Sequence, residues 1–406
     1  MKPKLAAAAV TLTALPLLPA CTTPDHPSPP TIRRDSAGIA IVESFRPAWG
    51  DSASWRVHPE PLLDLARSGD GPEHLFYGVD GMARLSDGTI VVANRGSQEI
   101  RWFSPGGRLI GEVGGHGEGP GEFDNLQQIE LAGDTVLALD YDETVALFAP
   151  GPRLVRVLRM RPFSHSVHYM DGGALVVPTL LNWTEAYGQL RDPEALLLYD
   201  LLGTPGDNIG QIPGAEEYVA EALSGRPLFP KRSVIDTHGG HIFTGSADLM
   251  QVEELSATGD TLRILRIPGY PLELTEAQVE AEREARLDVP LPQGMTLPPP
   301  FRQAIEEMPS PATRPAYDRM IVDATGAVWL RLFRGESERA GSAESGGRDL
   351  WLVFAASGEW LGNVEAPPGF TILDIWTDEV LGVWEDGMGE QSPRVQRLSR
   401  GARRER

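Results

Sequence analysis

The chain has 406 residues, of which 41% are hydrophobic, and it contains 44 glycines and 35 prolines. This hydrophobic fraction excludes a wholly disordered chain, and richness in glycine and proline without a collagen-like period predicts many tight turns between short strands. The 57 acidic and 36 basic residues give a formal net charge of −21. Such a surface repels a phosphate backbone, so nucleic acid is not an expected partner.

The first 20 residues are ordered like an export signal. Lys2 and Lys4 precede an uncharged apolar run, 5–18, whose 14 residues fall short of the roughly 20 that a membrane-spanning helix needs. The run ends in Leu18-Pro19-Ala20-Cys21, which resembles the lipobox of bacterial lipoproteins. The resemblance implies a signal peptide over 1–20 and lipid attachment at Cys21, where each buried CH₂ group contributes about 0.8 kcal/mol to anchoring. The alternative is an ordinary cleaved signal beside an incidental cysteine.

Cys21 is the only cysteine, so an intrachain disulfide and a cysteine-based zinc cluster are both excluded. The predicted lipid anchor makes the membrane an expected partner, on the periplasmic side of an outer membrane or at the cell surface. Residues 21–36 are rich in proline and poor in large apolar side chains, which predicts a semi-rigid tether. The last six residues, 401–406, form a basic tail.

Between the tether and the tail, a turn followed by a short strand recurs six times. Each copy has glycine or aspartate in the turn, a β-branched or aromatic strand after it, and a strand-like run before it. The six turn-and-strand copies cover 87–93, 133–139, 172–177, 239–243, 325–330 and 377–382. Two further strands follow most copies, for example 99–103 and 108–113 after the first.

Six units of four antiparallel strands predict an all-β fold, a six-bladed β-propeller over 37–400. The last unit has only three strands at the carboxyl end of the chain. Segment 55–65 stands where a fourth strand is needed, so we expect this N-terminal strand to complete the last blade and leave no open edge.

A helical and proline-rich insertion is predicted over 270–315, between blades four and five. Thr275 to Gln278 has the sequence of a capping box that opens a helix through Leu287. A second short helix is expected over 301–308. The insertion is either a lid over one face or a decoration.

The joins before the first two blades carry a family resemblance. Residues 115–123 have a Gly-rich, GxGPGxF-like form, and 68–76 are a degenerate copy. These joins resemble NHL-type repeats, and the chain as a whole resembles bacterial six-bladed propeller lipoproteins, although the later four blades lack the join. No helix or Lys-Ser/Thr pair follows the glycines, which argues against a phosphate-binding loop.

Carboxylates gather in loops that a propeller would place on one face. Their hard oxygen ligands could hold Ca²⁺, and the candidates we select are Asp124, Asp140, Asp142 and Asp386. The alternative is a solvated acidic surface. His165 and His168 should lie on the opposite face from His238 and His241, so zinc binding is not expected, and no catalytic triad or dinucleotide motif is found.

The resulting functional expectation is a membrane-anchored module outside the cytoplasm that binds a protein, peptide or glycan, without a cofactor other than the calcium considered above, and as a monomer. The rivals are a propeller enzyme, such as a metal-dependent lactonase-like hydrolase or a lyase acting at the central pore, and a purely structural envelope component. Because propellers host all three, metal ligands that converge on the pore from several blades would favour the enzyme.

Overall fold

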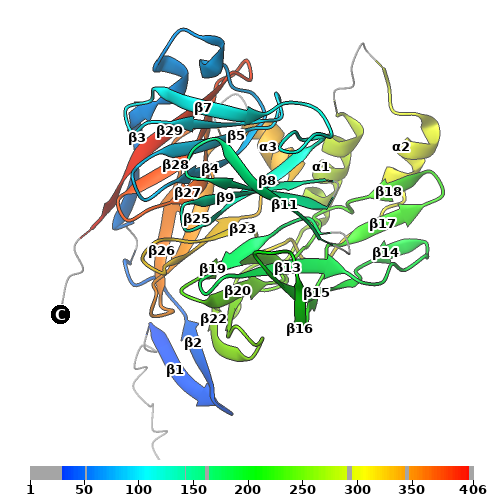
Figure 1. The fold of residues 1–406 in the computed structure, drawn as a ribbon. Helices are drawn as coiled ribbons and strands as arrows, with labels where there is room; N and C mark the ends of the chain where they lie inside the picture. The colour runs from blue at the N-terminus through cyan, green and yellow to red at the C-terminus, as the bar shows by residue number, and fades with distance from the viewer. Residues whose placement is uncertain are drawn as a thin grey trace, which may run out of the picture.

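The computed structural model describes residues 30–50, 53–141, 143–160, 164–289, 295–342 and 347–401. The predicted signal peptide, Cys21, and residues 402–406 of the predicted basic tail lie outside these ranges. Figure 1 shows a mainly β molecule made of several small sheets with a few helices at one side.

The strands of the described residues form seven sheets, six of which contain at least four strands. We number these six in chain order. Sheet 1 contains β4 (Val79–Arg84), β5 (Ile90–Asn94), β6 (Glu99–Phe103) and β7 (Leu109–Gly114), and sheet 2 contains β8 (Leu126–Ala132), β9 (Thr135–Asp140), β10 (Thr144–Ala149) and β11 (Arg153–Arg159). Sheet 3 contains β12 (His168–Met170), β13 (Ala174–Leu180), β15 (Pro193–Asp200) and β16 (Pro205–Pro213).

The second half of the chain repeats this order. Sheet 4 contains β19 (Val234–His238), β20 (His241–Gly245), β21 (Gln251–Leu255) and β22 (Thr261–Arg266), and sheet 5 contains β23 (Tyr317–Val322), β24 (Val328–Leu332), β25 (Leu350–Phe354) and β26 (Trp360–Glu365). Sheet 6 contains β27 (Phe370–Ile375), β28 (Glu379–Glu385), β29 (Gln391–Arg400) and β3 (Trp55–Asp64). In every sheet the first two strands are one of the hairpins predicted from the sequence.

The first strands of the six sheets contact one another in a closed cycle. Each contacts its successor, in the order β4, β8, β12, β19, β23 and β27, and β27 contacts β4. We call these the inner strands. The fold is therefore β-propeller-like, with its sheets arranged around a common axis.

The hydrophobic core lies between consecutive sheets. Strand β5 is buried at all five positions, because neighbouring sheets cover both of its faces, whereas the outermost strand β7 alternates between half-buried and exposed residues. Separate clusters join sheets 1–2, 2–3, 3–4, 4–5 and 5–6. A sixth packs Val92 of sheet 1 against Leu381 of sheet 6, so the last sheet also packs on the first.

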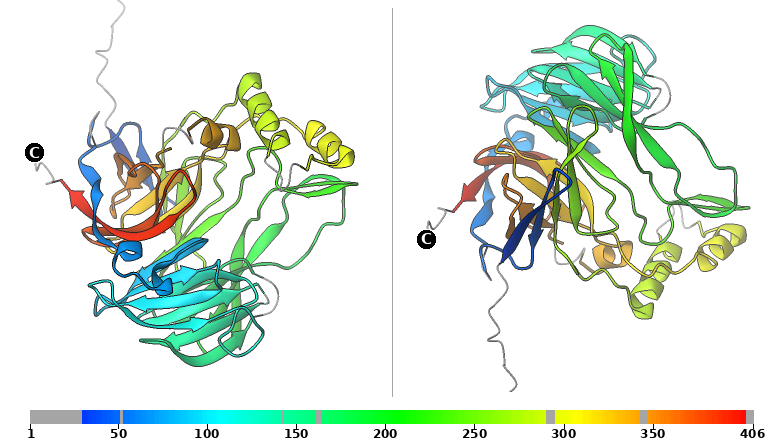
Figure 2. Two further views of the ribbon diagram at one scale, coloured as in Figure 1. Left: turned by 90° about the horizontal axis from the view of Figure 1, so that it is seen from above. Right: turned by 90° about the horizontal axis from the view of Figure 1, so that it is seen from below.

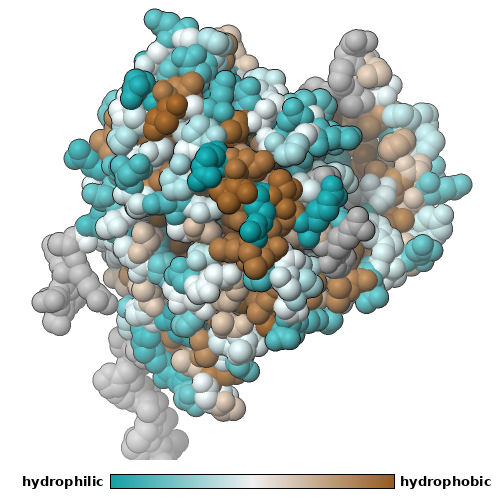
Figure 3. Space-filling view, in the orientation of Figure 1, coloured by the Kyte–Doolittle hydropathy of each residue, from teal (hydrophilic) through white to brown (hydrophobic). Residues whose placement is uncertain are grey.

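Outer strands leave some apolar surface uncovered. Strand β11 exposes Val155 and Val157. Figure 3 shows apolar side chains gathered near the middle of the view, in the region where Figure 1 places β8 and β11.

The N-terminal segment runs along the outside of sheets 4, 5 and 6. Strand β2 (Ile39–Ser44) pairs parallel with β22, and β1 (Thr31–Ser36) pairs with β2, so the last six residues of the predicted tether form a strand. The Trp49 amide then donates to the Leu361 carbonyl at 2.9 Å. Finally, β3 pairs antiparallel with β29 of sheet 6, the sheet that segment 55–65 was expected to complete.

Three helices and a small sheet are added to this repeat. Helix α1 (Glu276–Leu287) begins with the predicted capping box at Thr275 and Gln278, and α2 (Pro299–Glu306) follows it before β23. Helix α3 (Glu336–Ser342) and the sheet of β14 (Gly188–Leu190), β17 (Glu217–Ala220) and β18 (Leu223–Gly225) were not predicted. Two 3₁₀ turns, η1 (Leu65–Arg67) and η2 (Pro72–His74), precede β4. Among the described residues, no helix is long and apolar enough to span a membrane.

Candidate binding site at the axis

All of the added helices and the small sheet belong to one face of the ring. The loops that join one sheet to the next lie at the same end of the ring as the loops between the second and third strands of each sheet. This follows because the strands alternate in direction, so each inner strand begins at the end where the second strand finishes. Helices α1 and α2 and strands β17 and β18 lie in joins, whereas α3 and β14 lie in second-to-third connections. We call this end the elaborated face. Figure 2 shows these elements projecting together from one side of the ring.

The helices on this face are packed into one unit. Buried Glu282 of α1 accepts hydrogen bonds from the Glu336 and Ser337 amides at 2.8 and 3.0 Å, so its carboxylate caps the first turn of α3. Arg283 donates to the Ile305 carbonyl at the end of α2. A separate hydrophobic cluster fills the space between these elements and contains Tyr218, Leu228, Phe229, Val279, Ile305 and Met308.

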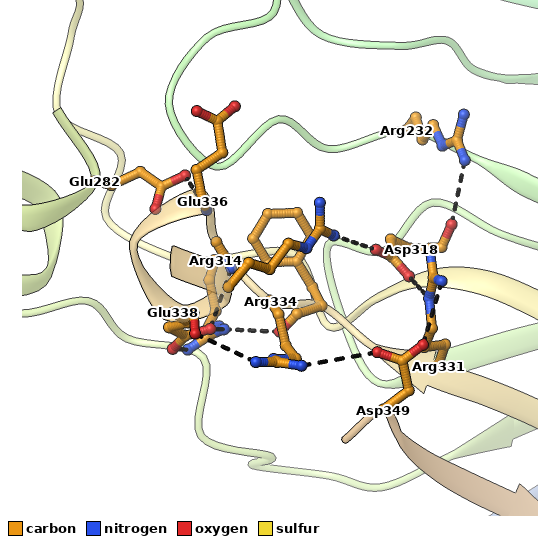
Figure 4. Close-up of polar contacts among 12 residues, drawn as sticks. Arg232, Glu282, Arg314, Asp318, Arg331, Arg334, Glu336, Glu338 and Asp349 are labelled. Carbon is orange, nitrogen blue, oxygen red and sulfur yellow. Dashed lines mark hydrogen bonds and ion pairs between the residues drawn. The ribbon is translucent and has the colours of Figure 1, made fainter. Parts of the chain in front are cut away.

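Ion pairs connect this unit to sheet 5 (Figure 4). Arg331 Nε lies 2.7 Å from Asp318 Oδ1, and the same guanidinium lies 3.5 Å from Asp349. Arg314 pairs with Glu338 of α3 at 2.7 Å. Arg339 of α3 also lies 3.2 Å from Asp318, so this carboxylate joins α3 to Arg331 of sheet 5.

Next to this network, the inner strands bring ionisable side chains to the axis. Every inner strand supplies one, and all six are partly accessible to water. We call this set the axial cluster: Asp80, Glu130, His168, Asp236, Arg319 and Asp374.

Hydrogen bonds fix the carboxylates of the axial cluster. Asp236 accepts from the Thr237 amide at 2.7 Å and from the Val322 amide, on the neighbouring inner strand, at 2.6 Å. Asp374 accepts from the Ile375 amide and from Trp376 Nε1. By contrast, the buried Oδ1 of Asp80 accepts no hydrogen bond from any described residue. Backbone and tryptophan donors of the described residues thus satisfy Asp236 and Asp374 but not Oδ1 of Asp80.

Desolvation shifts the titration of this cluster. It raises the pKa of Asp236 to about 7 and the pKa of Asp80 to about 6, and it lowers the pKa of His168 to about 4. The pKa values of Glu130 and Asp374 are raised as well, first by desolvation and then by repulsion from neighbouring carboxylates. Near neutral pH the axis therefore carries less negative charge than its carboxylates suggest.

Two arginines near the axis form no ion pair with a carboxylate of the described residues. Arg232, just before β19, donates to the Asp318 carbonyl oxygen at 3.3 Å, and Arg319 donates to the Leu373 carbonyl oxygen at 3.2 Å. Within the described ranges, neither guanidinium has a carboxylate within 4.0 Å. In Figure 4 the Arg232 guanidinium lies at the edge of the ion-pair network and is joined to it by its contact with Asp318.

The carboxylates selected from the sequence are placed differently. Asp140 is buried, and its oxygens accept the amides of Asp124, Asn125 and Tyr141 at 2.7–2.8 Å, so it closes the turn after β9. Asp386 accepts the amides of Met388 and Glu390 within its own turn. Asp124 is exposed, and Asp142 lies outside the described residues.

No group of three histidine, cysteine or acidic side chains within the described ranges is arranged to hold a metal ion. Calcium binding by Asp124, Asp140, Asp142 and Asp386 stays a prediction. Among the histidines, His168 contacts Ser166 Oγ at 3.1 Å, and His241 contacts Glu254 at 2.6 Å.

Sequence reasoning missed the axial cluster and Arg232. A signal was present: five of the six axial side chains are charged residues inside the run that precedes a Gly/Asp turn. Charged residues inside an otherwise apolar strand are costly unless they are paired or reach water, so they indicate an axial position.

The comparisons with known proteins concern the fold. No protein-family model and no curated protein matches the chain. Among solved structures, a Bacteroides fragilis protein provisionally described as exported is 10% identical, with a TM-score of 0.50 over 87% of this chain and 98% of that one. A DUF4221 family member from Bacteroides vulgatus is 9% identical (TM-score 0.49, 85% and 98%), and the RRP9 WD40 repeats are 10% identical (TM-score 0.45, 85% and 100%). The Bacteroides fragilis structure is thus similar in fold to this chain over most of its length.

Proposed function

We propose that the protein is an exported, lipid-anchored six-bladed β-propeller that binds a protein, peptide or glycan ligand on its elaborated face. The observation that carries the binding role is the placement of every added helix and of the small sheet on that single face. Loops carried by a rigid scaffold are where binding residues concentrate, and additions scattered at random would occupy both faces.

The propeller part of the proposal is supported by the six sheets, the closed cycle of inner strands, and the pairing of β3 with β29. The lipid anchor is supported by the lipobox-like end of the apolar run at Cys21. The Bacteroides fragilis structure, provisionally described as exported, agrees with a location outside the cytoplasm.

Exposed aromatic side chains also favour a binding role for this face. Trp183 and Tyr187, in the connection between β13 and β15, are 61% and 76% exposed. Large exposed aromatics next to polar groups are typical of recognition surfaces, because they supply contact area at a low cost in conformational entropy.

A photo-crosslinking experiment on intact cells tests the proposal. A photoreactive phenylalanine analogue replaces Tyr187 on the elaborated face, and the matched control replaces Leu202, which is 66% exposed in the turn between β15 and β16 on the opposite face. We expect one discrete adduct from position 187 and none from position 202. Equal adducts from both positions, or none from 187, would contradict the proposal.

The enzyme alternative depends on the axial cluster. Carboxylates from four inner strands and a histidine from a fifth do approach the axis, although the described residues bring no three of them together as metal ligands. Metal analysis of the purified protein separates the two functions. A stoichiometric metal ion in the parent protein that is lost in the Glu130→Gln variant would favour the enzyme.

A further inference from the structure

We propose that Arg232 and Arg319 form a binding site for an oxyanion, the carboxylate or phosphate group of a small ligand, at the axial end of the elaborated face. This inference rests on the proposed binding function and names the ligand chemistry of that same face. It begins from the finding that neither guanidinium meets a carboxylate within the described ranges.

One side chain belongs to an inner strand and the other to the segment that leads into the neighbouring inner strand. Arg232 lies two residues before β19, and Arg319 is the third residue of β23, which contacts β19 directly. Each guanidinium has five N–H donors, yet each makes only one hydrogen bond to a described residue, in both cases to a backbone carbonyl. Most of the donors are therefore available to a ligand.

Both groups are accessible and also desolvated. Arg232 is exposed and Arg319 half-buried, while desolvation lowers the pKa of Arg232 and lowers that of Arg319 to about 10. Repulsion from Arg331 and Arg232 contributes to the shift at Arg319. A bound oxyanion would relieve this repulsion and replace the lost hydration with charge-assisted hydrogen bonds.

The neighbouring carboxylates neutralise these charges only in part, since Asp318, Asp236 and Glu194 attract the guanidiniums without forming an ion pair with them. Asp318 lies close, but its carboxylate is already held by Arg331 and Arg339. Asp236 interacts with Arg319 electrostatically, but both of its oxygens accept backbone amides and desolvation raises its pKa to about 7. Arg232 and Arg319 therefore stay without a direct ion pair among the described residues, in a protein of net charge −21.

Two planar guanidiniums suit an oxyanion, since each can donate two parallel hydrogen bonds to its oxygens. Carboxylate and phosphate share this chemistry. The inferred ligand is therefore a uronic acid, an acidic peptide group or a phosphate ester rather than a neutral sugar.

Isothermal titration calorimetry of the mature full-length protein in detergent tests the inference, with inorganic phosphate, glucuronate and neutral glucose as the titrants. We expect saturable binding of at least one anion and none of glucose. Phosphate alone would identify a phosphate site, and glucuronate alone a carboxylate site.

Arg232→Gln should lower the affinity for the anion by about tenfold or more, as expected for loss of a charge-assisted contact. The control Arg153→Gln removes the same charge from exposed β11 and should leave affinity unchanged. Arg319→Lys keeps the charge but not the paired donors, and should also weaken binding. Absence of anion binding, unchanged affinity in either site variant, or equal weakening in the control would overturn the inference. If adducts at position 187 persist, the binding function stands without it.

Discussion

Asp64 of β3 accepts a hydrogen bond from Arg394 Nε of β29 at 2.9 Å, joining positions 330 residues apart. Both side chains are about 10% exposed, and Arg394 also lies 4.2 Å from the centroid of the Trp384 ring. This pair fastens the N-terminal strand to the carboxyl-terminal strand of sheet 6. It adds an ion pair to a contact that also includes backbone pairing and the approach of His58 Nε2 to Ser399 Oγ at 2.7 Å.

Asp64→Ala should therefore destabilise the protein by about 3 kcal/mol, because breaking a buried pair leaves the Arg394 charge without its partner. Glu365→Ala is the control, since the Arg348–Glu365 pair on sheet 5 is more than half exposed on both sides and should contribute less than about 1 kcal/mol. Urea unfolding measures both. A loss at Asp64 no larger than at Glu365 would show that β3 is not fastened by this pair.

The sequence predicted the parts of the fold that depend on local patterns. The turn at Asp87 and Gly88 is recognisable because Asp87 accepts the Thr89 amide and Gly88 has a φ of 88°, a conformation that glycine adopts without strain. The capping box at Thr275 was equally local. Strands such as β14 and β18 have three residues each, too few for a period, so they could not be predicted.

The site was harder to predict because its members come from different sheets. Asp140 attracted attention as part of a run of acidic residues, yet its carboxylate is occupied by backbone amides. Arg232 and Arg319 lie 87 positions apart and share no motif. Only the contact between β19 and β23 brings them to one end of the ring.

Asp236 should make stability depend on pH. Its pKa in the folded protein is about 7, above the ordinary value of 3.8, so between these values the folded state holds a proton that the unfolded state releases. The contribution of this group to stability therefore decreases as pH rises from about 4 to 7 and stays low above that.

Asp236→Asn removes the titration. The unfolding free energy of the variant minus that of the parent should increase by at least about 1 kcal/mol between pH 4.5 and 7.5, the value of one pKa unit. Asp87→Asn, at an exposed turn where hydrogen bonds to Thr89 lower the pKa of the carboxyl, should show no such increase. Parallel pH profiles for parent and Asp236→Asn would show that Asp236 is ionised throughout.

Lipid attachment at Cys21 is tested by mass spectrometry of the mature N-terminus. We expect acyl chains on Cys21 and release of Cys21→Ser protein from the membrane fraction, because only a thiol forms the thioether. Ser28→Ala, in the tether, should remain membrane-bound. An unmodified mature N-terminus at another residue would refute the assignment.

Calcium binding on the acidic loops is the remaining prediction from the sequence. Asp140 and Asp124 have different surroundings in the structure, so each is substituted separately. Asp140→Asn removes an acceptor from a buried carboxylate that holds three backbone amides, so it should lower stability by about 1–3 kcal/mol with or without calcium. Asp124→Asn changes an exposed side chain and should leave stability within about 0.5 kcal/mol of the parent.

If these loops bind Ca²⁺, calorimetric titration of the parent should show saturable heat, and Asp124→Asn should weaken it, since carboxylate charge sets the affinity of such sites. Asp87→Asn on the opposite face removes the same charge and serves as the control. The informative comparison is thus between two stable variants of equal net charge. Heat that is equal in Asp124→Asn and Asp87→Asn would exclude Asp124 as a ligand, and no heat in the parent would leave the acidic loops as solvated surface.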